Sequence, residues 1–201
     1  MKKLEELSKE ELILLIERMH QQLHRDSFTG LLNTRHFNFI LETEVERSSK
    51  YGYEFCLLIL DLDRFKQFND VNGHAAGSRL LKSFADFLLE NCRVNDFPFR
   101  YGGDEFTLLL PQTTKANGCR AAQNINRYVD GQKWLTRHHT VSVSIGVSSY
   151  PCDSDRPTEL FEMADRAMYV AKAAGGGKAA AAQWGLVETP PMPGWFTQRP
   201  S

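Results

Sequence analysis

The sequence predicts an α+β domain in which a central antiparallel β-sheet is flanked by helices. Short apolar runs and segments of helical periodicity follow one another in the order β-α-β-β-α-β, which is the ferredoxin-like order. Two of the expected strands are joined by the short tip Gly-Gly-Asp-Glu, as in a β-hairpin. The chain has 201 residues, of which 42% are hydrophobic, so it suits one domain with appendages.

An N-terminal helical stalk is expected over residues 1–25. Ser8 and Glu11 have the spacing of a capping box. We expect this helix to dimerise, the alternative being that it packs on its own domain. His20 and His24 are expected to be solvated, because no third metal ligand is evident. Apolar residues follow the capping box at the 4-3-4 spacing of a coiled-coil seam, namely Leu12, Ile16, Met19 and Leu23.

The sheet and its helices are expected within residues 26–178. The run FCLLIL at 55–60 is continuously apolar, as in a strand buried on both faces. The helical pattern at 64–91 is interrupted at Asn72-Gly73, because glycine weakens a helix interior. Residues 179–201 are expected to be a weakly ordered tail. The expected elements are helix 34–50, strand 55–60, helix 64–91, strands 97–101 and 106–110, helix 114–130, strand 139–148 and helix 157–174.

The hairpin tip Gly102-Gly103-Asp104-Glu105 lies between the apolar runs FPFRY and FTLLL. Glycine adopts positive φ readily and lets another molecule approach the backbone closely. The two carboxylates then project from a rigid two-stranded support. Taken alone, this segment is equally well a turn with two solvated acids.

A third carboxylate, Asp61, ends the apolar strand and adjoins the start of the next helix. Asp63 is in a position to cap that helix. The free N–H groups of residues 64–66, together with the charge of Lys66, suit phosphate oxygens. A carboxylate beside a phosphate cradle is a common way to hold Mg²⁺, which takes few protein oxygens and completes its shell with phosphate and water.

Six motifs are linked along the chain: Asp26-Ser-Phe-Thr-Gly-Leu, Asp61-Leu-Asp-Arg-Phe-Lys-Gln-Phe-Asn-Asp, Gly73-His, Arg100-Tyr-Gly-Gly-Asp-Glu-Phe, Val143-Ser-Ile-Gly-Val and Ala164-Asp-Arg-Ala-Met-Tyr-Val-Ala-Lys. In order and spacing they resemble those of GGDEF domains, the bacterial cyclases that join two nucleoside triphosphates into a cyclic dinucleotide. The resemblance covers roughly residues 25–178. It implies a cyclase palm fold, release of pyrophosphate, and a catalytic homodimer, because one site holds one triphosphate. The interruption near Asn72 is then expected to lie over the nucleotide.

The resemblance implies the roles of the site residues. Asp61, Asp104 and the Leu62 carbonyl are expected to bind metal, with Glu105 as proton acceptor or second-metal ligand. Asp61, Asp104 and Glu105 are therefore the expected catalytic residues. Two Mg²⁺ (or Mn²⁺) ions are expected per active site, with GTP and ATP as substrates. The expected nucleotide-binding residues are Arg64, Phe65, Lys66, Asn69, Ser78, Gly102, Gly103 and Lys172.

The chain departs from the family pattern at Gly176, where an arginine usually follows the phosphate-binding lysine by four residues. Lys178, after a flexible Gly175-Gly-Gly loop, is the candidate to replace that arginine. The string around Lys178 is not a P-loop, because the outer glycine spacing and the following Ser or Thr are missing.

The segment Gly73-His-Ala-Ala-Gly-Ser78 is a second departure. Diguanylate cyclases usually have Asp at the last position, where its carboxylate accepts two hydrogen bonds from guanine. A serine cannot accept both, but it can pair with adenine, while Asn69 is kept. The pattern resembles the hybrid promiscuous (Hypr) subgroup, which makes 3′,3′-cyclic GMP-AMP from GTP and ATP alongside cyclic di-GMP. We favour this interpretation over a strict diguanylate cyclase with a tolerated serine.

Arg93-Val-Asn-Asp96 matches the family's inhibitory product site, R-x-x-D. A cyclic dinucleotide is expected to bind there, since Arg can fork onto phosphate or guanine and Asp can accept guanine N–H groups. The alternative is a surface ion pair. A catalytically inactive domain that only binds cyclic dinucleotide here is the alternative function, and the intact Asp61, Asp104 and Glu105 argue against it.

Composition excludes several other classes. The net charge of −1 gives no basic footprint for a nucleic-acid polymer. The longest apolar run is far below the ~18 residues of a membrane span, and no secretory h-region follows Met1. We therefore expect no membrane insertion of this chain and a cytoplasmic location. Free thiols are expected at Cys56, Cys92, Cys119 and Cys152, which are widely spaced with no C-x-x-C.

Overall fold

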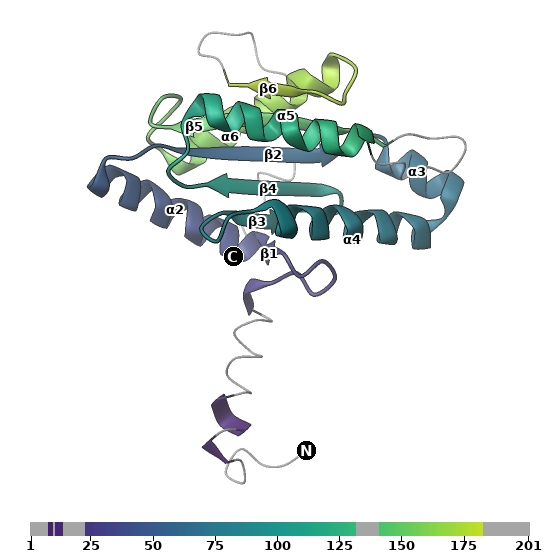
Figure 1. The fold of residues 1–201 in the computed structure, drawn as a ribbon, viewed down its shortest axis with the longest axis horizontal. Helices are drawn as coiled ribbons and strands as arrows, with labels where there is room; N and C mark the ends of the chain where they lie inside the picture. Colours follow the sequence, from purple (N-terminus) through teal and green to yellow (C-terminus); the bar gives the residue numbers. More distant parts are fainter. Residues whose placement is uncertain (1–7, 10, 14–22, 132–140, 183–201) are drawn as a thin grey trace, which may run out of the picture.

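The structure is a computed structural model that describes residues 8–9, 11–13, 23–131 and 141–182. Six strands form one mixed sheet in the order β1-β3-β4-β2-β5-β6 (Figure 1). The four inner strands pair antiparallel in the predicted ferredoxin-like arrangement, whereas β1 and β6 pair parallel with their neighbours. The elements are β1 Leu32–Asn33, α2 Thr34–Tyr51, β2 Phe55–Leu62, α3 Phe65–Asn72, α4 His74–Asn91, β3 Phe97–Arg100, β4 Glu105–Leu110, α5 Lys115–Gly131, β5 Val143–Tyr150, α6 Pro157–Ala173 and β6 Ala179–Ala181.

Strand β2 is central, and all eight of its residues are buried. Its side chains alternate between two hydrophobic cores, as the pleat of a strand requires. Leu58 and Leu60 lie in the core formed with α4 and α5, whereas Leu57 and Ile59 lie in the core formed with α2 and α6. Helices therefore cover both faces of the sheet (Figure 1). The same alternation places Asp61 on the face of α2 and α6.

Several boundaries differ from the prediction. The helix expected at 64–91 is two helices, α3 and α4, which meet at the single residue Gly73 with φ 82°. Residues 179–181, expected in the tail, form the edge strand β6, so the tail prediction is wrong at this boundary. The strand expected at 139–148 spans Val143–Tyr150 within the described residues. The two-residue β1 is too short to leave a sequence pattern.

Most of the expected stalk, residues 1–25, lies outside the described residues. The capping box at its start is confirmed: Ser8 N donates to Glu11 Oε2 at 2.8 Å, and Glu11 N donates to Ser8 Oγ at 3.2 Å. His24, expected to be solvated, contacts the ring of His36 with 4.3 Å between centroids. Also outside the described residues are Ile16, Met19 and His20.

Two further expectations concern the state of the cysteines and the presence of a membrane-spanning helix. The four cysteines are free thiols, as predicted. The buried Cys56 Sγ donates to the carbonyls of Thr113 and Thr114 at 3.3 Å each. Among the described helices, none combines the length and the apolar character that a membrane crossing requires.

Candidate active site

The predicted catalytic carboxylates meet at one end of the sheet, where β2 and β4 run antiparallel. Asp61 of β2 is paired directly opposite Glu105 of β4. Directly opposite residues project to the same face, with Cβ atoms about 4.5–5.5 Å apart. Both side chains therefore lie on the face of α2 and α6. Lys172 of α6 reaches this face, and its Nζ lies 2.7 Å from Asp61 Oδ2.

The tip of the hairpin is held by backbone hydrogen bonds. Tyr101 N and Gly102 N donate to the Glu105 carbonyl, at 2.9 and 3.1 Å. Leu62 N donates to the Asp104 carbonyl at 3.3 Å, which ties the tip to the end of β2. A Cβ added to Gly102 would lie only 2.8 Å from Glu105 Oε2. Gly102 therefore leaves the room into which the Glu105 carboxylate folds.

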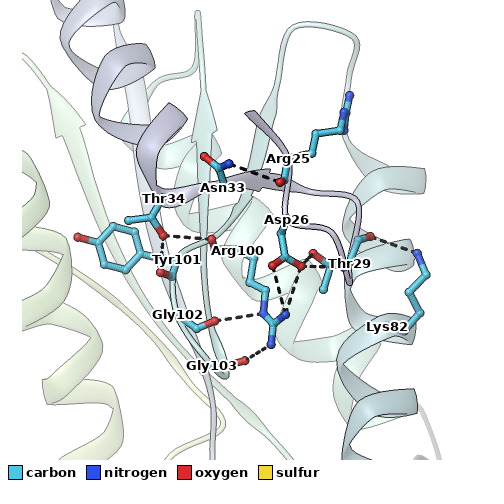
Figure 2. Close-up of polar contacts among 10 residues, drawn as sticks. All are labelled: Arg25, Asp26, Thr29, Asn33, Thr34, Lys82, Arg100, Tyr101, Gly102 and Gly103. Carbon is cyan, nitrogen blue, oxygen red and sulfur yellow. Dashed lines mark hydrogen bonds and ion pairs between the residues drawn. The ribbon is translucent and has the colours of Figure 1, made fainter. Parts of the chain in front are cut away.

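Figure 2 shows a second support for the tip, the Arg100 guanidinium. Its Nε donates to the Gly102 carbonyl at 3.1 Å and its Nη2 to the Gly103 carbonyl at 2.9 Å. Its Nη1 lies 3.2 Å from Asp26 Oδ1. The sequence pattern alone gives neither Arg100 nor Asp26 a role, because their pairing joins segments 74 positions apart.

Asp26 belongs to a turn that contacts two parts of the domain (Figure 2). Its Oδ1 accepts hydrogen bonds from Thr29 N at 2.7 Å and Thr29 Oγ1 at 2.6 Å. Burial raises the pKa of Asp26, but the bonds from Thr29 and Arg100 outweigh it, so this pKa lies below its ordinary value. Lys82 Nζ of α4 donates to the Thr29 carbonyl at 3.1 Å. The turn therefore joins the segment that follows the expected stalk to both the hairpin and α4.

The carboxylates facing α6 are poorly stabilised as anions by the chain itself. Burial raises the pKa of Asp61; the Lys172 ammonium lowers it by less, and Asp104 and Asp63 raise it further. Burial also raises the pKa of Glu105, and the charges of Asp61 and Asp104 add to that effect. Desolvated acids that repel one another gain most from a bound cation.

The Leu62 carbonyl oxygen is a further candidate metal ligand beside the carboxylates of Asp61, Asp104 and Glu105. The N–H of Asp63, in the same peptide, donates at 2.9 Å to the carbonyl of Ser142, the residue before β5. In a trans peptide the C=O points opposite to the N–H, so the Leu62 carbonyl faces away from β5 and toward the hairpin. It therefore lies on the same side of β2 as the tip carrying Asp104.

The donor chemistry fits Mg²⁺ or Mn²⁺, which take carboxylate, carbonyl and water oxygens. Within the parts of the chain that the structure describes, no three His, Cys, Asp or Glu side chains already form a metal-binding group. Instead, Lys172 neutralises Asp61 in this structure. The oxygens that would hold the ions belong to Asp61, Leu62, Asp104 and Glu105.

Helix α3 begins differently from the prediction. Asp63 does not cap it, and its carboxylate instead accepts from Ser142 Oγ at 2.6 Å and Ser144 Oγ at 2.7 Å. The N-cap position is Arg64, whose φ of 57° is left-handed and whose side chain makes no capping bond. The first N–H groups of α3 thus have no capping side chain, and they lie beside the exposed Lys66. This end of α3 is suited to phosphate oxygens.

The predicted base-binding residues lie where α3 meets α4. A Cβ added to Gly77 would lie 1.7 Å from Asn69 Oδ1 and 3.1 Å from Phe65 Cζ, so glycine is required for this close packing. Asn69 Oδ1 is buried and has no hydrogen-bond partner in the structure. A buried acceptor of this kind suits a donor from a ligand. Ser78 follows Gly77 and is exposed on α4.

Residues 23–178 match the family model described as "Diguanylate cyclase, GGDEF domain". This chain belongs to the GGDEF-domain family. Among curated relatives, the response regulator PleD of Caulobacter vibrioides is 39% identical over 154 residues, which cover 75% of this chain and 34% of PleD. Diguanylate cyclase TpbB of Pseudomonas aeruginosa is also 39% identical over 154 residues, covering 75% of this chain and 35% of TpbB. The chain thus spans about a third of the length of these relatives.

Solved GGDEF domains share the fold. The coiled coil and GGDEF domain of DgcB from Caulobacter crescentus, in complex with c-di-GMP, has a TM-score of 0.79 at 27% identity, covering 86% of this chain and 93% of that one. The GGDEF domain of TpbB from Pseudomonas aeruginosa has a TM-score of 0.74 at 34% identity, covering 80% of this chain and 95% of that one. The predicted fold class is therefore confirmed.

In this GGDEF domain the R-x-x-D segment is a closed turn rather than a side-chain ion pair. Arg93 N donates to Asp96 Oδ2 at 2.8 Å, and Asp96 N donates to the Arg93 carbonyl at 3.0 Å. Burial raises the pKa of Asp96, and Arg93 lowers it by less. Two pockets, of about 390 and 350 Å³, are each lined by both residues. Asn124 and Tyr128 line the larger pocket, and Arg47 lines the smaller.

The loop after α6 contains Gly176, which stands where the family pattern usually has an arginine. Its three glycines, 175–177, all have positive φ, of 104°, 75° and 65°. Lys178, the predicted replacement for the missing arginine, donates through Nζ to the Ala174 carbonyl at 2.9 Å. Its charge therefore lies at the C-terminal end of α6, where the helix dipole favours a cation.

Proposed function

We propose that this GGDEF domain condenses two GTP molecules into 3′,3′-cyclic di-GMP and releases pyrophosphate. The observation that carries this proposal is the register of β2 and β4, which sets Asp61 opposite Glu105 beside Asp104. The uncapped start of α3 lies next to them. Membership of the GGDEF-domain family and the similarity to diguanylate cyclase TpbB support the same reaction class.

The reaction is attack of a ribose 3′-OH on an α-phosphate, carried out twice. Asp61, the Leu62 carbonyl, Asp104 and Glu105 are the residues that would hold two Mg²⁺ (or Mn²⁺) ions, which neutralise the phosphates and the leaving pyrophosphate. Glu105, whose carboxylate folds over Gly102, is placed to accept the 3′-OH proton or to bind the second ion.

Triphosphate binding is assigned to groups around this cluster. Lys172 turns from Asp61 to the phosphates when substrate enters, and Arg64 and Lys66 flank the phosphate-binding N–H groups of α3. Asn69 Oδ1 accepts a hydrogen bond from the base. The remaining nucleotide contacts are assigned to Phe65, Ser78, Gly102, Gly103 and the backbone of the hairpin tip.

One domain holds one triphosphate, so we assign catalysis to a homodimer whose two sites face each other. Residues 1–25 are assigned to the stalk and residues 26–178, extended by β6, to the catalytic domain. A cytoplasmic location follows from the use of GTP. Specific activity should rise with protein concentration until the dimer saturates.

A second candidate function differs from the first in the cyclic dinucleotide that is made. The family model and the relative TpbB are named for the diguanylate reaction, and neither supports the cyclic GMP-AMP product that the sequence favours. Strict diguanylate cyclase activity is therefore the main proposal. Ser78 is the observation behind the second candidate, Hypr-type synthesis of 3′,3′-cyclic GMP-AMP from GTP and ATP, because a hydroxyl cannot accept both guanine donors.

One experiment tests both functions. Purified protein is incubated with equimolar GTP and ATP and Mg²⁺, and products are identified by mass spectrometry. Cyclic di-GMP as the sole dinucleotide supports the main proposal; a mixture that Ser78→Asp shifts toward cyclic di-GMP supports the second. The Asp104→Ala variant is the control for metal-dependent turnover. A wild-type protein that makes no dinucleotide contradicts both and returns the domain to a receptor of cyclic dinucleotide.

A further inference from the structure

Asp63 takes no part in the proposed chemistry, yet its carboxylate accepts three hydrogen bonds. Besides the hydroxyls of Ser142 and Ser144, its Oδ2 accepts a hydrogen bond from Gly177 N at 2.8 Å. Ser144 is paired directly opposite Asp61 across β2 and β5. Asp63 therefore connects three segments: the end of β2, the start of β5 and the loop after α6.

The same loop is attached at its other end to Asp61. Gly175 N donates to the Lys172 carbonyl at 3.0 Å, and Lys172 Nζ pairs with Asp61 Oδ2 at 2.7 Å. The segment from Lys172 to Gly177 is thus held at both ends by two acids, Asp61 in β2 and Asp63 just after it. One contact, Asp61–Lys172, has to open when a cation and triphosphate enter; the other, Asp63–Gly177, does not.

We propose that Asp63 is a positioning residue, which keeps the 175–177 loop and Lys172 beside the site when the Asp61–Lys172 ion pair opens. The proposal relies on the proposed function only for the identity of the substrate. Charged acceptors form the stronger class of hydrogen bond, so the Asp63–Gly177 contact reinforces the backbone bonds of the loop, such as Gly176 N to the Ala171 carbonyl at 3.1 Å. The loop that the sequence describes as flexible is then a fixed element of the site.

Gly176 gives independent support. A Cβ at this position would lie 2.8 Å from Asp63 Oδ2 and 2.9 Å from its Cγ, and the φ of 75° disfavours any side chain. The Asp63 carboxylate cannot yield freely, because three donors hold it. The absence of the family's arginine at 176 is therefore consistent with this contact: here the loop is positioned by a carboxylate against bare backbone.

The test compares Asp63→Ala with Asp153→Ala. Asp153 is a matched control, because it also accepts from a serine hydroxyl and a backbone N–H of β5, those of Ser149, at the opposite end of the strand. Four quantities are measured well below each melting temperature: KM for GTP, kcat, GTP affinity by calorimetry, and hydrogen exchange over residues 172–178. Asp63→Asn serves as a second variant should Asp63→Ala not fold.

Asp63→Ala should raise KM and weaken GTP affinity about 10-fold, leave kcat within about threefold, and speed exchange of the Gly177 amide at least about 10-fold. Asp153→Ala should lower Tm without changing KM or that exchange. Gly176→Ala should reproduce the KM effect, with a less than additive result in combination with Asp63→Ala.

An unchanged KM and unchanged exchange in Asp63→Ala or Asp63→Asn overturn the proposal. Equal KM effects of Asp63→Ala and Asp153→Ala reduce Asp63 to a purely structural acid, which also overturns it. A wild-type protein without cyclase activity contradicts the proposed function instead, and the exchange and calorimetry arms still decide whether Asp63 positions the loop for GTP.

Discussion

Asp61 and Asp153 are both buried acids beside a lysine, but they differ in how many hydrogen bonds their carboxylates accept. Asp61 is paired with Ser144 at the start of β5, and Asp153 follows the end of that strand. Asp153 is saturated: Oδ1 lies 2.5 Å from Lys115 Nζ, and Oδ2 accepts from Ser149 N at 2.8 Å and Ser149 Oγ at 3.1 Å. Asp61 has one donor among the described residues, Lys172 at 2.7 Å. The exposed fractions of the two residues are similar, 8% for Asp61 and 1% for Asp153, so burial alone does not explain the difference.

The surroundings of the two acids explain the difference. Asp61 lies among other acids, and both Asp104 and Asp63 raise its pKa. A structural carboxylate is stabilised by the chain that folds around it, whereas this carboxylate is left short of donors and close to like charges. Such an arrangement weakens the fold slightly and favours a bound cation. The comparison therefore separates a site from a structural ion pair without reference to the family.

The largest effect is expected from Asp61→Asn. Loss of the central carboxylate should reduce cyclase turnover about 1,000-fold or more, because the amide cannot hold a divalent ion equally well. The fold should persist, since the acid contributes little net stability. Turnover and thermal melting are measured on the same preparation. Near wild-type turnover at saturating Mg²⁺ would remove Asp61 from the metal site.

The reverse pattern is expected from Asp153→Ala. Removing one partner of a buried, hydrogen-bonded ion pair should lower the free energy of unfolding by about 3 kcal/mol. Turnover per folded molecule should stay close to wild type, because Asp153 follows the end of β5, whereas Asp61 is paired with Ser144 at its start. Urea unfolding and initial rates at low temperature check the two halves of this statement. A large loss of turnover with unchanged stability would break the comparison.

Asp96 sharpens the comparison as an intermediate case, since it is half-buried and bonded through Oδ2 to Arg93 N. If its turn binds product, Arg93→Ala should weaken inhibition by added cyclic di-GMP about 10-fold and leave initial rates nearly unchanged. Inhibition curves on both proteins measure this. Superimposable curves would assign the turn a structural role only.

The smallest effect is a stabilisation. The pKa of Glu105 is raised in the folded state, so between its unfolded and folded pKa values the native state binds more protons. The free energy of unfolding of metal-free protein therefore falls as pH rises through that window. Glu105→Gln removes this loss, and in EDTA at pH 7.5 it should raise Tm by roughly 2–4 °C, with the gain disappearing near pH 4. A lower Tm for Glu105→Gln at pH 7.5 contradicts the sign.

Sequence reasoning reached the hairpin and Asp61 because local patterns define them. An apolar strand that ends in Asp, and a Gly-Gly tip between two apolar runs, predict the elements and their polar ends. Sequence reasoning placed Asp63 wrongly as a helix cap, because its partners Ser142 and Ser144 lie 79 and 81 positions away. The Asp26–Arg100 contact could not be predicted for the same reason, since the two residues are 74 positions apart.

Strand β6 was not predicted from the sequence for a different reason. Its residues, Ala179–Ala181, carry no alternating pattern, and only the parallel register with β5 makes them a strand. The two-residue β1 is likewise defined by its pairing with β3. Edge pairing of this kind depends on the finished sheet, so local sequence contains no signal for it.

Mn²⁺ binding is the most direct measure of whether Asp61 favours a bound cation, because Mn²⁺ is itself one of the ions that its carboxylate suits. Free Mn²⁺ is followed by electron paramagnetic resonance in the presence of a non-reactive GTP analogue, for wild type, Asp61→Asn and Asp153→Asn. Wild type and Asp153→Asn should bind Mn²⁺ with equal affinity, and Asp61→Asn should bind it about 10-fold or more weakly. Equal Mn²⁺ affinity in Asp61→Asn and wild type would contradict this prediction.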